Sequence, residues 1–222
     1  MSRTCTLLRP FGRAKIFCAK GSLLWVSALL DSRAELSSRF DALLPAHFKD
    51  RLVILMTGHR RESFDGGIAR VCGAMARIAE RPDVAVVFPV HRNPNVRGAI
   101  EALRGHPNVL LTDPVDYPEL VFLLKRCRLV VTDSGGIQEE APSFGKPVLV
   151  TRDTTERPEA MELGLARLVG TDDERLYLEM AALLDDPDAY ARMSRVANPY
   201  GDGRASIRIA QRLTSEAISA CD

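Results

Sequence analysis

The chain has 222 residues, of which 46% are hydrophobic and 6% aromatic, and its 30 basic and 29 acidic residues leave a net charge of +1. This length exceeds a usual single domain but falls short of two, and the apolar content suffices for a packed, mainly aliphatic core. A net charge near zero argues against strong electrostatic binding to nucleic acid or a membrane surface, and no stretch approaches the roughly 20 apolar residues of a membrane span. A phosphorylated small ligand remains compatible, because it needs only local positive charge.

The cysteine pattern predicts a reducing compartment. The five cysteines are scattered, odd in number, and form neither a CxxC pair nor a Cys/His cluster. Basic residues precede the apolar run 23–30, as in a weak signal peptide, but Asp31-Ser32-Arg33 follows it instead of a small-residue cleavage site. We therefore expect a cytoplasmic protein without a structural metal.

The N-terminal part of the chain differs from the rest. Residues 1–22 show neither helical nor strand periodicity, and we expect a poorly ordered head there. Apolar residues then recur at helical spacing over 23–44, and Pro45 stops the run. The predicted organisation is a head over 1–22, a helix and linker over 23–50, and one domain over 51–222.

From residue 51 onward, short apolar runs alternate with amphipathic segments. Strands that alternate with helices of this length imply right-handed βαβ units and a parallel sheet covered on both faces. The predicted fold class is therefore α/β, with a doubly wound parallel sheet. Strands are expected at 52–56, 84–88, 109–111, 129–132, 148–150 and 166–169, and helices at 67–80, 95–103, 119–126, 137–141, 174–184, 188–196 and 205–217.

Polar clusters follow five of the predicted strands. In a doubly wound sheet, ligands bind beyond the carboxyl ends of the strands, where the strand order reverses. One shared site is the economical explanation for polar residues at so many strand ends. The clusters lie at 57–62, 89–93, 113–114, 133–136 and 151–159.

The run Asp133-Ser134-Gly135-Gly136 follows a buried strand and precedes a short helix. Two glycines allow a tight turn, and the free amides of a helix N-terminus can hold a phosphate. The spacing matches neither a Walker loop nor GxGxxG, so an ordinary tight turn is the alternative. Glu139 and Glu140 lie in that helix, where a carboxylate could accept two hydrogen bonds from a ribose diol; solvated glutamates are the plainer interpretation.

Several basic residues stand at strand ends. His59 could donate to a pyrophosphate oxygen, or it could cap a surface loop. Of Arg60 and Arg61, one is expected to contact phosphate and the other to face solvent. His91 is a weaker candidate of the same kind, and the two histidines lack a third ligand for a metal. Arg157 precedes Pro158, where a helix could begin, so its side chain is placed either to reach a ligand or to form a structural salt bridge.

Four segments together resemble one family. GHRRESF at 58–64, PVHRNPNV at 89–96, TDSGGIQEEAPSFGKPVLVTRDTTERPE at 132–159 and NPYGDGRAS at 198–206 are similar to the non-hydrolysing UDP-N-acetylglucosamine 2-epimerases. The resemblance runs from about Leu23 to the C-terminus and covers the second half of that family's protein. It implies a Rossmann-like domain resembling the C-terminal domain of a GT-B fold, with the nucleotide sugar in a cleft between two domains.

The resemblance also implies roles for individual residues. Ser134, Gly135 and Gly136 would bind the diphosphate, Glu140 the ribose hydroxyls, Arg157 the nucleotide, and His59 the diphosphate side of the substrate. His91 would be a remnant of a regulatory second UDP-GlcNAc site.

Two positions depart from the family's pattern. Leu120 stands where the family often has an aromatic residue near the uracil, and Val115 stands where it has a glutamine. Tyr117 or Phe122 is the alternative partner for the base.

The family's chemistry removes the C2 proton, expels UDP to form a glycal, and adds UDP back with the proton on the other face. This requires stabilisation of the leaving group and an acid/base pair at C2. The family's acidic residues near C2 belong to an N-terminal domain that these 222 residues do not contain, so we expect a truncated or frame-shifted nucleotide-binding half with little or no activity alone.

The partners implied are UDP-GlcNAc and UDP, with no cofactor, no nucleic acid and no membrane, and a homodimer in the full-length family. The alternatives are a stand-alone UDP-sugar binding module, the donor-binding subunit of a split enzyme, or a decaying fragment that folds poorly.

Overall fold

The computed structural model describes residues 43–58, 66–91, 93–195, 199–201 and 204–219. The predicted head, most of the predicted helix and linker over 23–50, and the candidates His59, Arg60 and Arg61 lie outside these ranges.

Six parallel strands form one sheet in the order β3-β2-β1-β4-β5-β6. The chain moves outward from β1 to β3, then returns to the other side of β1 and continues to β6. This is the doubly wound arrangement predicted from the sequence, and its order reverses between β1 and β4. The strands are β1 (Leu52–Thr57), β2 (Val84–Pro89), β3 (Val109–Thr112), β4 (Leu129–Thr132), β5 (Val148–Val150) and β6 (Ala166–Leu168).

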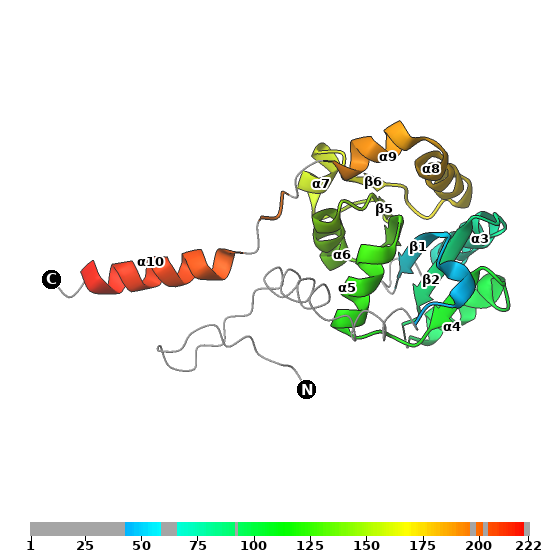
Figure 1. Cartoon of the computed structure of the whole chain (residues 1–222), viewed down its shortest axis with the longest axis horizontal. Helices are drawn as coiled ribbons and strands as arrows, with labels where there is room; N and C mark the ends of the chain where they lie inside the picture. Colours follow the sequence, from blue (N-terminus) through cyan, green and yellow to red (C-terminus); the bar gives the residue numbers. More distant parts are fainter. Residues whose placement is uncertain (1–42, 59–65, 92, 196–198, 202–203, 220–222) are drawn as a thin grey trace.

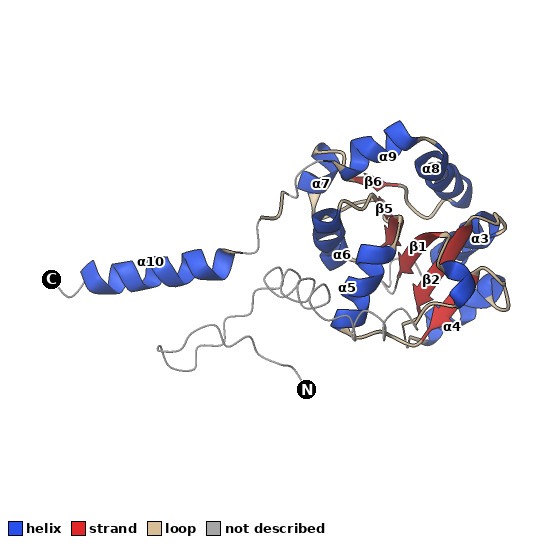
Figure 2. Cartoon of the chain, in the orientation of Figure 1, coloured by secondary structure: helices blue, strands red, loops and turns tan. Residues whose placement is uncertain are grey.

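Helices cover both faces of the sheet (Figure 2). Alternate strand residues point to opposite faces, so Val53 and Leu55 of β1 join one apolar cluster while Ile54 and Met56 join the other. The first face carries η1 (Ala46–Phe48), α5 (Tyr117–Arg126), α6 (Gly135–Glu140), η4 (Ala141–Phe144) and α7 (Pro158–Glu162). The second carries α3 (Gly67–Ala79), α4 (Pro94–Ala99), η3 (Ile100–Leu103), α8 (Asp173–Asp185) and α9 (Pro187–Ser194).

Side-chain caps set the starts of three helices. Asp116 and Glu119 form a capping box at α5. Asp172 accepts a hydrogen bond from the Arg175 amide at α8, and Asp186 accepts from two amides at α9. Each cap satisfies amides that the helix itself leaves without partners, which is why these helices begin one or two residues earlier than apolar periodicity predicted.

The last helix, α10 (Ala205–Ser219), extends away from the body of the domain (Figure 1). Its Ile207, Ile209 and Leu213 side chains are 52%, 51% and 61% exposed. Among the described residues, no helix is long and apolar enough to cross a membrane.

Candidate functional site

The sheet reverses its order between β1 and β4, and polar groups meet at the carboxyl ends of these two strands. The hydroxyl oxygens of Thr57 on β1 and Thr132 on β4 lie 2.6 Å apart. The Thr132 hydroxyl also accepts a hydrogen bond of 3.0 Å from the Ser134 amide, which fixes the chain where it leaves β4. The helices that follow β1 and β4, α3 and α6, lie on opposite faces of the sheet, so the reversal point is the expected place for a ligand.

Helix α6 begins directly after this point, at Gly135 and not near Ile137 as the sequence predicted. Ser134 is the N-cap residue, but its side chain makes no capping hydrogen bond. The amides of the first turn of a helix have no partner within the helix, and they carry partial positive charge. The start of α6 is therefore suited to an anion.

Neither Gly135 nor Gly136 has a positive φ, so the contribution of a glycine here is the space that a missing side chain leaves at Gly136. The described glycines with positive φ are at other positions, so the chain passes from β4 into α6 without a positive φ at Gly135 or Gly136. A Cβ built on Gly136 would meet only the Ser134 Oγ, at 3.9 Å, so the volume in front of this residue is open. Open volume at a helix start lets a ligand approach the backbone closely.

Glu140, at the end of α6, is half-buried and lies against α5. Its Oε1 accepts a hydrogen bond of 3.3 Å from the Tyr117 hydroxyl. Burial raises the pKa of the Glu140 carboxyl to about 7; the Tyr117 hydrogen bond lowers it in part, and the neighbouring Glu139 charge raises it. Burial also raises the pKa of Tyr117, which therefore stays protonated and donates.

Arg157 is the N-cap residue of α7, and its side chain makes no capping hydrogen bond but contacts α6. Its guanidinium forms an ion pair with Glu139. Its amide donates to the Thr155 hydroxyl at 3.0 Å, and that hydroxyl donates to Gln138 Oε1 at 2.7 Å. The structure thus contains the salt bridge considered for Arg157, and this bridge places the guanidinium beside the Glu139 carboxylate.

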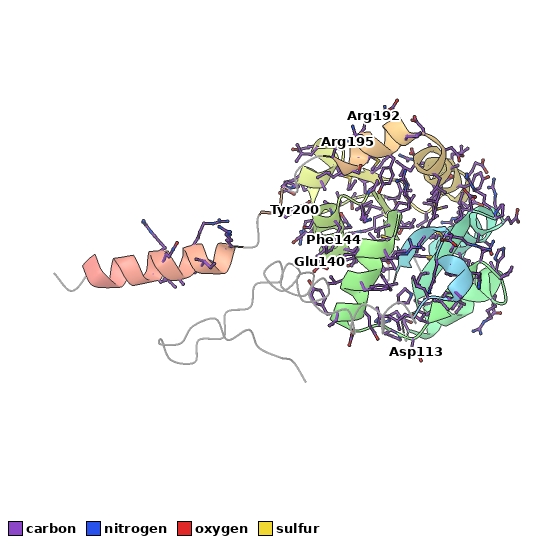
Figure 3. All side chains as sticks on the ribbon, in the orientation of Figure 1. Asp113, Glu140, Phe144, Arg192, Arg195 and Tyr200 are labelled. Atoms are coloured by element: carbon purple, nitrogen blue, oxygen red, sulfur yellow. The ribbon has the colours of Figure 1, made fainter. Side chains whose placement is uncertain are left out.

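Tyr200, from the turn-rich segment before α10, adds a further contact to the start of α7. Its hydroxyl donates to the Arg157 carbonyl at 3.4 Å and accepts from the Ala160 amide at 3.3 Å. Figure 3 shows Glu140, Phe144 and Tyr200 along the side of the body toward α10. Tyr200, which lies in the segment 198–206 that resembles the family, therefore supports the start of α7 at Arg157.

The sequence assigned no individual role to three polar residues that are buried around the site. Gln138 is fully buried, and its Nε2 has no hydrogen-bond partner in the part of the chain that the structure describes. Asp133, 1% exposed, follows β4, and a Cβ on Gly58 would lie 3.7 Å from its Oδ2. Arg152, 7% exposed, follows β5 and pairs with Glu156 at 3.5 Å. A charged residue directly after an apolar strand was the signal for the last two; Gln138 had none.

The remaining candidates lie apart from α6. His91 follows β2 and is exposed, and its Nδ1 accepts from the Asn93 amide at 3.2 Å. Leu120 is half-buried on α5, whereas Phe122 is 9% exposed within the core, so its ring does not serve as a surface for a base. Val115 lines a cavity of about 250 Å³ beyond β3, together with Leu44 and Asp113.

Comparison with known proteins identifies the family. The family model of the UDP-N-acetylglucosamine 2-epimerases matches residues 21–214. The chain belongs to the UDP-N-acetylglucosamine 2-epimerase family. The UDP-N-acetylglucosamine 2-epimerase of Escherichia coli strain K12 is 51% identical over 200 residues, which are 89% of this chain and 53% of that protein. The chain thus spans about half the length of the curated relatives it matches.

Solved structures of this isomerase family have the same fold as this chain. The crystal structure of UDP-GlcNAc 2-epimerase from Neisseria meningitidis bound to UDP-GlcNAc matches with a TM-score of 0.84 and 38% identity, over 88% of this chain and 53% of that one. The Methanocaldococcus jannaschii UDP-GlcNAc 2-epimerase in complex with UDP-GlcNAc and UDP matches with a TM-score of 0.72 and 28% identity, over 90% of this chain and 55% of that one. The α/β fold, with helices on both faces of the sheet, is therefore shared with family members that hold the nucleotide sugar.

Proposed function

We propose that this chain binds the UDP portion of UDP-N-acetylglucosamine at the carboxyl ends of β1, β4 and β5, as the nucleotide-binding half of a UDP-GlcNAc 2-epimerase. The observation that carries the proposal is the grouping of Ser134, Gly135 and Gly136 at the start of α6 with Glu140 and Arg157 on the same side of the sheet. His59, which follows Gly58 in the sequence, would contribute on the diphosphate side of the substrate, as the family resemblance implies.

Each group has a distinct part in the proposed site. The open start of α6 would receive the diphosphate, and the Glu140 carboxylate would accept the ribose hydroxyls. Arg157 carries five N–H donors, so it can keep Glu139 and still contact the nucleotide. A guanidinium–phosphate contact is a charge-assisted hydrogen bond, roughly twice as strong as a neutral one.

This arrangement suits the elimination chemistry of the family. When the C2–H and C1–O bonds break and the C1=C2 bond forms, UDP departs with the C1–O electron pair, and negative charge grows on its terminal phosphate. The start of α6 and Arg157 would stabilise that charge, both in the departure of UDP and in its return. Proton transfer at C2 needs further acid/base groups, which the sequence analysis did not find in these 222 residues.

Calorimetric titration with UDP tests the site. We expect UDP to bind the chain, and Arg157→Gln to weaken binding about 10- to 100-fold, which corresponds to about 1.5–3 kcal/mol for a hydrogen bond to a charged group. The matched control is Arg192→Gln on α9, where the ion pair with Asp186 is exposed, so affinity should be unchanged. Absence of UDP binding at millimolar ligand would reject the proposal.

A stand-alone UDP-sugar binding module or the donor-binding subunit of a split enzyme is the second candidate, favoured by the grouping of Ser134, Glu140 and Arg157, which suits a nucleotide and supplies no assigned acid/base group for C2. Incubation with UDP-GlcNAc, followed by proton NMR for UDP-ManNAc, separates the two. Turnover by the chain alone would exclude the second candidate and would disprove the expectation that C2 acid/base groups are lacking.

We also propose a cytoplasmic location and a homodimeric full-length protein. Cys72 and Cys127 are free and buried, and burial raises the pKa of both thiols to about 12, as suits unreactive thiols in a reducing compartment. Light scattering on a size-exclusion column measures the oligomeric state, and a monomer would contradict the homodimer.

A further inference from the structure

Tyr117 links α5 to α6 by a hydrogen bond to Glu140, which lies 23 positions further along the chain. It is the first residue of α5, and its hydroxyl reaches Glu140 at the end of α6 across 3.3 Å. The capping box holds this end of α5 firmly, because the Glu119 amide donates to Asp116 Oδ1 at 3.0 Å and the Asp116 amide donates to Glu119 Oε2 at 2.8 Å. The Tyr117 ring also packs against the apolar core. The hydroxyl is therefore presented to Glu140 from a rigid support.

Glu140 is costly to keep ionised where it lies. It is half-buried, and the charge of Glu139 on the same helix opposes its ionisation, although Glu139 is itself paired with Arg157. The hydrogen bond from Tyr117 favours the ionised form and restricts the carboxylate to one orientation. A carboxylate has about four lone-pair positions, so it can keep this bond and still accept two ribose hydroxyls.

We propose that Tyr117 is a positioning residue, which holds the Glu140 carboxylate for the two ribose hydroxyls and thereby makes the site select nucleotides that carry both. The inference rests on the proposed function and deepens it, since it assigns the ribose selectivity to a pair of residues on α5 and α6.

The Tyr117→Phe variant tests this assignment. It keeps the ring and its packing and removes only the hydroxyl. We expect UDP to bind this variant about five-fold more weakly, the effect of one lost hydrogen bond of about 1 kcal/mol. The affinity for 2′,3′-dideoxy-UDP, which lacks both hydroxyls, should be unchanged, so the ratio of the two affinities falls.

Tyr190→Phe on α9 is the matched control. Its half-buried hydroxyl also donates one hydrogen bond, to the Arg128 carbonyl at 3.0 Å, but next to the amino end of β4, opposite the end where the site lies. This variant loses a comparable bond and should leave the ratio of the affinities unchanged.

The pH profile of binding provides a second readout. Without the Tyr117 hydrogen bond, the pKa of the Glu140 carboxyl rises further, because burial and the Glu139 charge both favour the protonated form. The affinity of the Tyr117→Phe variant for UDP should therefore fall more steeply from pH 8.5 to pH 6 than that of the unchanged chain. A purely structural role for Tyr117 would shift neither this profile nor the ratio.

The outcomes separate the two proposals. If the unchanged chain binds neither nucleotide, the proposed function fails and the inference fails with it. If it binds both, the inference alone is overturned by an equal loss of both affinities in Tyr117→Phe, or by equal binding of the two nucleotides before substitution. If the variant does not fold, carbon NMR of the unchanged chain decides: UDP should lower the pKa of the Glu140 carboxyl and 2′,3′-dideoxy-UDP should not, and equal shifts would overturn the inference.

Discussion

The core under α3 and α8 and the region around α6 and α7 lie on the same six-stranded sheet, yet they differ in how they treat polar groups. Ile54, Leu129 and Leu149 of the sheet pack with Met75 of α3, all with 0% exposure, in a cluster made entirely of apolar side chains. Around α6, by contrast, Gln138 is fully buried. Polar burial of this kind lowers stability unless every group finds a partner.

The core under α3 and α8 therefore stabilises the domain, whereas the buried polar groups around α6 and α7 lower its stability. A half-buried carboxylate with a raised pKa, close to an ion pair, is typical of a binding site and not of a structural core. Substitutions in the core under α3 and α8 should therefore lower stability and leave ligand affinity unchanged. Substitutions around α6 and α7 should weaken ligand binding without lowering stability.

The largest effect is expected from Leu149→Ala on β5. It removes a fully buried side chain from the strand between β4 and β6, so the free energy of unfolding should fall by about 2–5 kcal/mol. Urea denaturation followed by circular dichroism measures this. Leu178→Ala on α8, where the side chain is 56% exposed, is the control and should change stability by less than about 0.5 kcal/mol. A loss below about 1 kcal/mol for Leu149→Ala would remove the contrast between the two regions.

Glu140→Gln is expected to have a smaller effect, a gain in the free energy of unfolding at alkaline pH instead of a loss. The pKa of this carboxyl is raised from 4.5 to about 7, so the folded protein holds the proton more tightly than the unfolded chain in that window. Stability contributed by the proton is complete below pH 4.5 and is lost as the pH rises toward 7. Glutamine stays neutral, so the variant should match the unchanged chain at pH 4 and exceed it by about 1 kcal/mol at pH 8, a value reduced because part of the carboxyl faces solvent.

Thermal unfolding at the two pH values checks this expectation, and titration with UDP should show weaker binding by the same variant. Glu101→Gln is the control, since Glu101 lies on η3 in an exposed pair with Arg104 and should give no comparable gain at pH 8. A variant less stable than the unchanged chain at pH 8 would show that Glu140 supports the fold instead of weakening it.

The smallest effect is expected on α10. Its Leu213 is 61% exposed, whereas Leu176 of α8 is fully buried. Leu213→Ser should change the free energy of unfolding of the domain by less than about 0.5 kcal/mol, and Leu176→Ser should lower it by more than about 2 kcal/mol. Calorimetry of both variants is the measurement. A comparable loss from Leu213→Ser would mean that the apolar face of α10 is packed in solution.

Much of the fold could be predicted because its signals are local. Apolar runs such as 129–132 and 148–150 reflect strands buried on both faces, and the structure confirms them as β4 and β5. Boundaries were less certain where caps and tertiary contacts decide them: the helix expected over 95–103 divides into α4 and η3, and α6 begins two residues early.

The candidate site was predicted only in part. Ser134 and Arg157 stood out because polar residues after strands are conspicuous in an apolar sheet, and Glu140 because it lies in the helix that follows the glycine run. Gln138 did not, because its burial depends on Thr155, which is 17 residues away in the chain. The pairing of Arg157 with Glu139 was one of two interpretations, and it depends on a contact between residues 18 positions apart in the chain, which the sequence alone does not reveal.

The sequence by itself determined the doubly wound sheet, the order of its elements and the resemblance to the epimerase family, because periodicity and motifs depend on neighbouring residues. The tertiary structure decided which groups act together around Val130–Glu159. The Tyr117–Glu140 hydrogen bond and the raised pKa of Glu140 arise only when α5 and α6 pack on one face of the sheet, because burial and distance between remote segments are properties of the folded chain.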